Sequence, residues 1–252
     1  MTTVAAANDA PRTPALARAT AARLAATEYQ RFIDLLTSLG AAGWTEQTDC
    51  PQWDVRAMAT HALGMAEMAA SIREQMRQVK TATTRGGVFI DALTALQVEE
   101  RAGMQPADII ERFVRVAPKA ARGRRMTPWF IKRRTMPQHQ VVGGREEMWT
   151  IGYLLDVILT RDPWMHRIDI TRATGAAHTL TPEHDGVIVD DLVSEWAKRH
   201  GKPFRLDLHG PAGGSWTVGD GGPRLELGVV EFCRAISGRA PVEGLLATAV
   251  PF

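Results

Sequence analysis

The residues best suited to chemistry lie in the segment TRDPWMHRIDITRATG, which spans residues 160–175. It contains two acids and a histidine, at Asp162, His166 and Asp169. Residues four apart lie on one face of a helix with their Cβ atoms about 5 to 6 Å apart, so Asp162 and His166 are spaced to ligate a single ion. His61, on the apolar face of an upstream helix, could supply a third ligand.

Two imidazole nitrogens and one carboxylate oxygen suit a divalent metal such as zinc, and three protein ligands leave a fourth position open for water or substrate. Asp169 would then accept a hydrogen bond from the second ring N–H of His166, although it is also a possible ligand in place of Asp162. The alternative is a purely structural role. In that case His61 is a hydrogen-bonded core histidine, Asp162 caps a helix, and His166 is the centre of a local Asp-His-Asp cluster. Spacing alone leaves both interpretations open.

The elements that must position these residues follow from the apolar pattern. Apolar side chains recur at helical spacing through most of the first 175 residues. Asp54 can cap the helix that carries His61. Pro163 predicts a kink in the last of these helices, or a new start with Asp162 as its cap. The predicted helices cover residues 15–40, 54 to about 78, 88–103, 105–123, and about 145 to 174.

The pattern changes after Gly175. Residues 181–200 predict one more helix, and FRLDLHG then alternates with a period of two, which predicts a strand with one apolar face. SWTVGDGGPRLEL predicts two strands joined by a Gly-Asp-Gly-Gly turn, and GVVEFCRAISGRA predicts a helix packed on the sheet. The predicted fold class is therefore α+β, a four-helix-type bundle followed by a small α/β domain. The predicted divisions are a flexible leader at 1–14, a bundle at 15–175 and a C-terminal domain at 181–252.

Composition narrows the class of protein. The 252 residues are 45% hydrophobic and 23% charged, with a formal net charge of +2, which argues against a nucleic-acid-binding surface. A run from Lys119 to Arg134 holds seven basic residues and no acid, and we interpret it as a solvated connection or as an attraction for a carboxylated substrate. Cys50 and Cys233 match no disulfide framework. With no export signal and no apolar run long enough to span a membrane, the expected location is the cytoplasm.

Three segments carry a resemblance to a known family. TDCPQWDVRAMATHALG resembles the start of the second helix in the mycothiol-dependent maleylpyruvate isomerase family, part of the wider DinB-like metal-binding bundle superfamily. TRDPWMHRIDI resembles that family's second metal-binding helix, and FCRAISGRA after a short sheet is similar to its sterol-carrier-like C-terminal domain. The resemblance implies one divalent metal held by His61, Asp162 and His166. Two departures stand out, because the family pattern has Glu in place of Asp162 and Pro163 lies between the paired ligands.

The resemblance implies a metal-dependent enzyme that uses a small thiol, with mycothiol expected, for isomerisation or S-transfer to an electrophilic small molecule. Arg85 and Arg239 are candidates for binding anionic groups of substrate or thiol, because guanidinium offers a planar fork to a carboxylate. The alternative for each is an exposed loop arginine. The alternative for the whole protein is a non-catalytic small-ligand or lipid-binding role, which would need an open apolar face on the C-terminal sheet.

Overall fold

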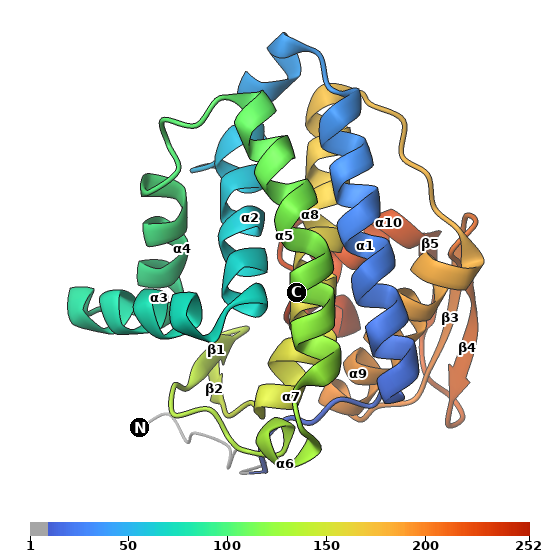
Figure 1. Ribbon diagram of the computed structural model, residues 1–252. Coiled ribbons are helices and arrows are strands. Elements are labelled where there is room, and N and C mark those ends of the chain that lie inside the picture. Colours follow the sequence, from blue (N-terminus) through green and yellow to red (C-terminus); the bar gives the residue numbers. More distant parts are fainter. Residues whose placement is uncertain (1–9) are drawn as a thin grey trace. The chain divides into compact units, whose positions relative to one another are not determined.

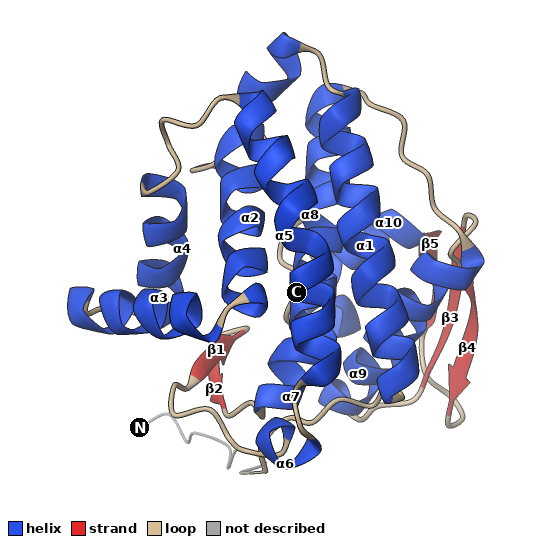
Figure 2. Cartoon of the chain, in the orientation of Figure 1, coloured by secondary structure: helices blue, strands red, loops and turns tan. Residues whose placement is uncertain are grey.

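The computed structural model describes residues 10–252, and this part of the chain is mainly helical with two small sheets (Figure 2). Its residues divide into two compact units. The last passage of the chain from the first unit to the second falls between Ala177 and His178, inside the segment expected to link the bundle and the C-terminal domain. The predicted domain bounds, 15–175 and 181–252, stay a prediction. The first unit comprises the chain up to Gln140 together with Glu146–Ala177, and the second comprises Val141–Arg145 and His178–Phe252.

Most of the predicted leader, residues 1–9 of 1–14, lies outside the described residues. Its described end is attached to the rest of the first unit through Arg12. The backbone N–H of Arg12 donates to the carbonyl of Met148 at 2.7 Å, and the carbonyl of Arg12 accepts from the N–H of Thr150 at 3.0 Å. These bonds hold the chain beside the segment that leads into the last bundle helix.

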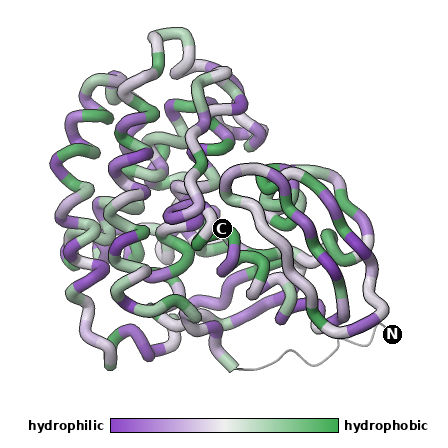
Figure 3. The backbone as a smooth tube through the Cα atoms, turned by 90° about the vertical axis from the view of Figure 1, so that its right-hand side faces the viewer, coloured by the Kyte–Doolittle hydropathy of each residue, from purple (hydrophilic) through white to green (hydrophobic). Residues whose placement is uncertain are grey.

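Four long helices of the first unit pack around a common apolar core (Figure 1). Each helix buries apolar side chains at three- and four-residue spacing, as with Val55, Met58 and Ala62, and polar and apolar segments alternate along the bundle helices (Figure 3). The aromatic rings of Phe32 and Phe113 meet in this core with centroids 5.4 Å apart. This arrangement confirms the predicted four-helix-type bundle. The helices are α1 (Arg18–Ser38), α2 (Val55–Ala70), α5 (Pro106–Met126) and α8 (Leu159–Thr174).

A shorter helical pair, α3 (Ile72–Arg85) and α4 (Phe89–Glu99), packs beside α2. The prediction of one helix from 54 to about 78 is therefore wrong, because the chain breaks at Ser71. The Ser71 backbone is extended, and its hydroxyl accepts from the backbone N–H of Glu74 at 3.3 Å. Serine followed three residues later by glutamate is a helix-start signature. The apolar stripe that runs across this break concealed it.

The last bundle helix also differs from the prediction. Residues Arg145–Glu147 form strand β2, so the helical segment starts later, at α7 (Ile151–Tyr153). A wide π turn at Leu154–Ile158 then leads directly into α8. Of the two predicted outcomes, a kink or a restart, the restart at Asp162 does not occur, since Pro163 lies inside α8 and the change in winding falls one turn before it. Asp162 is therefore not a helix cap.

The second unit is a three-stranded sheet with helices on its apolar face. Strand β3 (Phe204–His209) is central, with β4 (Gly214–Val218) antiparallel on one side and β5 (Arg224–Gly228) parallel on the other. The two strands predicted on either side of the Gly-Asp-Gly-Gly turn are therefore present, but each pairs with β3 and they do not pair with each other. A Cβ on Gly222 would lie 2.0 Å from the carbonyl oxygen of Pro203, so the glycine-rich loop crosses close to the start of β3 instead of turning back on itself.

The apolar face of β3 is covered. Phe204 is buried, as are Leu206 and Leu208, and this confirms the predicted alternation. The ring of Trp196, on α9 (Val187–His200), lies 4.8 Å from Phe204 and 5.4 Å from Phe232 on α10 (Val229–Ile236). Aromatic side chains from both helices thus occupy the face that a lipid-binding role would have to leave open.

The remaining elements are short. None of the helices in residues 10–252 is long and apolar enough to cross a membrane. The short elements are 3₁₀ turns at Ala41–Thr45 and Gly244–Ala247, α6 (Trp129–Lys132), β1 (Gln140–Val142), and a π turn at Pro182–Gly186 that opens α9.

Candidate metal centre

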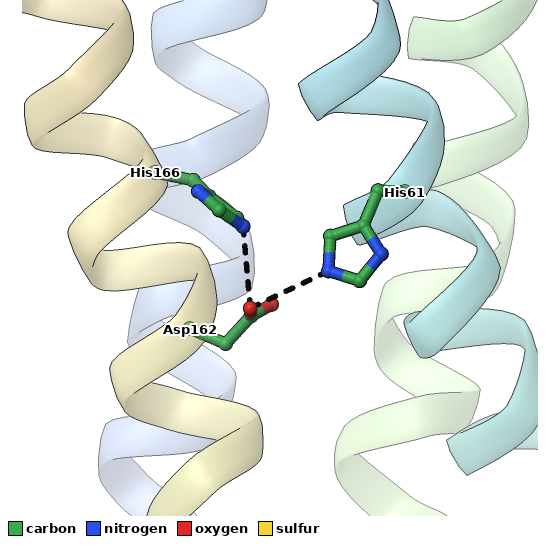
Figure 4. Close-up of side chains that lie close together, drawn as sticks. All are labelled: His61, Asp162 and His166. Carbon is green, nitrogen blue, oxygen red and sulfur yellow. Dashed lines mark hydrogen bonds and ion pairs between the residues drawn. The ribbon is translucent and has the colours of Figure 1, made fainter. Parts of the chain in front are cut away.

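Three side chains from two helices converge inside the bundle (Figure 4). His61 projects from α2, while Asp162 and His166 project from α8, one turn apart. The Nε2 atoms of His166 and His61 lie 3.2 and 3.4 Å from the same oxygen, Oδ1 of Asp162. One potential ligand atom from each residue lies within 4.8 Å of the others. The i, i+4 spacing on α8 thus places the pair toward His61 as the sequence predicted.

The donor set fits a divalent cation. Both imidazoles are buried, and 16% of the Asp162 side chain remains exposed. His166 Nε2 and Asp162 Oδ2 are buried atoms without a hydrogen-bond partner. Buried polar atoms normally have partners. Two nitrogens and a carboxylate oxygen left facing one point are the ligands that zinc and similar ions take in proteins.

The charges in this cluster shift the pKa values of its members. Burial by itself would raise the pKa of Asp162, but the neighbouring His166 and His61 outweigh it and hold that pKa well below its usual range. Burial lowers the pKa of His166, whereas the negative charge of Asp162 and the contact with Asp169 raise it, and the net result is about 9. Without a bound cation, His166 therefore holds a proton at neutral pH. A divalent cation would take that proton's place.

Asp169 supports His166 from the same helix. Its Oδ2 lies 3.3 Å from Nδ1 of His166, and its side chain is fully buried. Ionised carboxylate oxygens only accept, so this contact places a proton on Nδ1 and leaves Nε2 directed at Asp162. The geometry agrees with the supporting role expected for Asp169, and the orientation of Nδ1 toward it favours Asp162 as the carboxylate ligand.

The side of the candidate centre formed by α8, which carries Asp162 and His166, is here called the α8 wall. It depends on a buried arginine. Leu159 N–H bonds to the carbonyl of Leu154, which leaves the carbonyl of Leu155 without its helical donor. Pro163 has no N–H, so the carbonyl of Leu159 also lacks a donor. Arg124 supplies both, through Nε to Leu155 at 2.7 Å and through Nη1 to Leu159 at 2.9 Å. Arg124 was predicted to lie in a solvated basic stretch, but it is 2% exposed.

Lys132 is a second exception within that stretch, because its ammonium group is paired with Asp156 at 2.5 Å and is largely buried. The other five basic residues of the run are exposed, as predicted. They are Lys119, Arg122, Arg125, Arg133 and Arg134.

The side of the centre formed by α2, which carries His61, is here called the α2 wall. Its supporting side chains differ, and the sequence did not predict them. Asp54 caps α2 by accepting from the N–H of Ala57 at 2.7 Å, as predicted. Nδ1 of His61 lies 2.8 Å from Oε1 of Gln97, a fully buried residue on α4. The ring of Trp53 lies 4.9 Å from that of His61 and 5.8 Å from that of His166. The sequence feature that could have identified this support is Gln97, a polar residue within the apolar stripe of the third predicted helix.

Each of the two candidate substrate-binding arginines has a described contact of its own. Arg85 ends α3 and pairs with Glu99 of α4 at 2.8 Å. Arg239 follows α10 in the second unit, and its carbonyl accepts from Arg234 at 3.3 Å. Their roles toward a substrate stay predictions.

The fold and the cluster define the class: a helical bundle with a candidate metal centre between two facing helices, followed by a small α+β unit. The model of the family described as "Mycothiol maleylpyruvate isomerase N-terminal domain" matches residues 25–171, more than half of the chain and a segment that includes all three converging residues. This chain belongs to that family, which confirms the resemblance seen in the sequence.

Solved structures extend the likeness to the C-terminal part. The crystal structure of the mycothiol-dependent maleylpyruvate isomerase is 15% identical to this chain with a TM-score of 0.58. A crystal structure of a histidine-to-alanine mutant of that enzyme is 14% identical with a TM-score of 0.56. Both alignments cover 89% of this chain and 90% of the other, so they show a shared fold across both units. Among curated proteins no significant match was found.

Proposed function

We propose that this chain is a metal-dependent enzyme that uses mycothiol to act on a small electrophilic substrate. The observation that carries the proposal is the convergence of His61, Asp162 and His166, with buried atoms lacking hydrogen-bond partners, in a member of the maleylpyruvate isomerase family. The name of the structural neighbours supports isomerisation of an unsaturated keto acid such as maleylpyruvate. Zinc is the proposed metal, because it takes two histidines and a carboxylate and leaves a position open.

When bound, a divalent cation stabilises the thiolate form of a thiol whose pKa is ordinarily near roughly 8.5. The chain's own residues suit that task. His61 and His166 contribute neutral nitrogens and Asp162 contributes one negative charge, so a divalent cation among them keeps a net positive charge for an anionic sulfur. Binding of a cation at Nε2 would release the His166 proton to solvent, which would couple metal binding to pH.

Isomerisation then needs only addition and expulsion of the thiol. Addition converts a carbon–carbon double bond into a single bond that can rotate, and expulsion restores the double bond in the other geometry. An arginine would orient the substrate's carboxylates, and Arg85 is the proposed candidate in the first unit because it already binds a carboxylate, that of Glu99. Arg239 is the corresponding proposal in the second unit. If the carbanion formed by addition is protonated by solvent before the thiol is expelled, the sulfur stays bonded to carbon and the site performs S-transfer.

The test is turnover of maleylpyruvate by purified protein in four conditions: with and without mycothiol, and before and after chelation and reloading with zinc. The proposal expects isomerisation only when both thiol and metal are present. A panel of other electrophiles, with product analysis, separates isomerisation from S-transfer. Zinc-loaded protein that neither isomerises nor consumes thiol with any of these substrates would contradict the proposal.

A further inference from the structure

A chain of buried amides leads from the surface to His61. Gln97 on α4 and Gln78 on α3 are each fully buried, although neither carries a charge or lies among the three candidate ligands. Nε2 of Gln97 donates to Oε1 of Gln78 at 2.9 Å, and Oε1 of Gln97 lies 2.8 Å from Nδ1 of His61. Two buried glutamines in an apolar stripe are costly unless their hydrogen bonds are satisfied.

The outer end of this chain fixes the direction of every bond in it. Nε2 of Gln78 faces two oxygens, Oε1 of Glu74 at 2.8 Å and the carbonyl of Gly64 at 3.3 Å. The hydrogen bond from Arg77 is the main reason that the pKa of Glu74 is lowered despite burial, so Glu74 is ionised. Both oxygens therefore only accept. The amide of Gln78 cannot be flipped, and its oxygen must face Gln97.

The same argument applies to the next amide inward, that of Gln97. Because Oε1 of Gln78 only accepts, the Nε2 of Gln97 must face it and the oxygen of Gln97 must face His61. An amide oxygen only accepts, so Nδ1 of His61 carries a proton. A neutral imidazole has one ring proton, which leaves the electron pair of Nε2 directed at Asp162 Oδ1, 3.4 Å away. A cation between these two acceptors would relieve their mutual repulsion.

Gly64 makes room for this arrangement. It lies on α2, three residues after His61, and a Cβ at this position would lie 2.6 Å from Cγ and 2.8 Å from Cβ of Gln97. The side chain of Gln97 therefore packs directly against the backbone of α2. The close approach of α4 to α2 brings the amide within hydrogen-bond distance of the imidazole.

We infer that Gln97, oriented by Gln78, is a positioning residue that fixes His61 in the tautomer with Nδ1 protonated and Nε2 free to act as a ligand. The consequence for metal binding rests on the proposed function, whereas the tautomer itself does not. The two hydrogen-bonded glutamines, here called the glutamine relay, give His61 an uncharged partner. They therefore orient its ring without adding negative charge to the centre.

The direct test is nitrogen-15 NMR of the histidine rings in the metal-free protein, at a pH where the His61 ring is neutral. His61→Gln assigns the signals by their loss. We expect proton attachment at Nδ1 in the wild type. Attachment at Nε2 would overturn the inference, and this arm needs neither metal nor activity, so it is independent of the proposed function.

The second arm uses Gln97→Met, which fills a similar volume without an amide oxygen. We expect the His61 tautomer to shift toward Nε2 protonation and the affinity for zinc alone, measured by competition with a chelator, to fall about 10- to 100-fold. Gln78→Met, which frees the Gln97 amide to flip, should give a smaller change in the same direction. Gln75→Met, on the same helix but outside the relay, is the matched control and should change neither quantity. An unchanged tautomer in both Gln97→Met and Gln78→Met would overturn the inference even if the wild type binds zinc.

Discussion

The two walls of the candidate metal centre are built in different ways. On α2, His61 sits in a regular helix, and its ring is oriented by an uncharged amide from α4, 36 residues away in the sequence. On α8, His166 follows a π turn and an internal proline, and its ring contacts the carboxylate of Asp169 on the same helix. One wall is locally regular and depends on distant contacts, whereas the other is locally irregular and carries its own carboxylate.

The two walls therefore differ in whether the supporting group repairs the backbone geometry of a helix or leaves the charge of the centre unchanged. A π turn changes the winding just before the candidate ligands and leaves carbonyls that another group must satisfy, and such turns are frequent at functional sites. Arg124 satisfies them here. On the α2 side no such repair is needed, so the support can be an amide that leaves the charge of the centre unchanged. Variants on the α8 wall should therefore change the stability of the protein and its pH dependence. Variants on the α2 wall should change the orientation of the His61 ring.

The largest effect is expected from Arg124→Met. This variant leaves the buried carbonyls of Leu155 and Leu159 without donors, and each unsatisfied buried acceptor costs about 1 to 3 kcal/mol, so we expect roughly 2 to 6 kcal/mol of lost stability in denaturant unfolding. Arg125→Met is the matched control, since the adjacent arginine is exposed and its loss should stay within about 0.5 kcal/mol. Equal effects for the two variants would show that Arg124 does not support the α8 wall.

A pH effect should follow from His166 in the metal-free protein. Its pKa is raised from 6.5 to about 9 in the folded state, so its stabilising contribution is full below 6.5 and is lost as the pH rises through about 9. The expected loss is at most roughly 3 kcal/mol. Unfolding with chelator present, followed from neutral to alkaline pH, measures it. His166→Gln should remove this alkaline loss, whereas His139→Gln, at an exposed histidine, should keep it; a flat wild-type profile would refute the assignment.

A smaller loss is expected from Asp169→Asn. An asparagine of the same shape retains an oxygen acceptor but removes the negative charge, and loss of such a supporting partner typically lowers metal affinity about 10- to 100-fold. Asp162→Asn should lower it further, because it removes the proposed carboxylate ligand itself. Chelator competition with zinc measures both. A larger loss from Asp169→Asn than from Asp162→Asn would assign the carboxylate ligand to Asp169 instead.

The smallest effect on the centre is expected from Arg85→Ala. The ion pair with Glu99 is partly exposed, so its loss should change stability by less than about 1 kcal/mol and leave zinc affinity unchanged. If Arg85 orients a substrate carboxylate, KM for a dicarboxylate substrate should rise. Glu99→Ala, which removes the partner but keeps the arginine, is the control. An unchanged KM in Arg85→Ala would remove Arg85 from the proposed substrate site.

The sequence was most informative where spacing on a single element decides the outcome. Helical periodicity predicted the bundle, the alternation at Phe204, Leu206 and Leu208 predicted the face of β3, and the i, i+4 spacing of Asp162 and His166 predicted that they share a face. These patterns depend on local geometry alone.

The sequence was least informative where partners are distant. The break at Ser71 was hidden because the apolar stripe continues through it, and the order of β4 and β5 depends on contacts with β3 that no local turn signal encodes. The carbonyls of Leu155 and Leu159, at the π turn and just after it, accept from Arg124, which lies 35 residues before Leu159 in the sequence. Gln97 became recognisable as a site residue only once α4 was placed against α2.

The most direct test of the central claim is the number of divalent metal ions bound per chain. Metal-free wild type, His61→Ala, His166→Ala and the surface control His139→Ala should be loaded with zinc, freed of excess, and analysed for bound metal alongside a circular dichroism spectrum. The account predicts about one ion per chain in the wild type and in His139→Ala, and strongly reduced occupancy in His61→Ala and His166→Ala with helical content retained. A wild type that cannot be loaded, or full occupancy in folded His166→Ala, would contradict it.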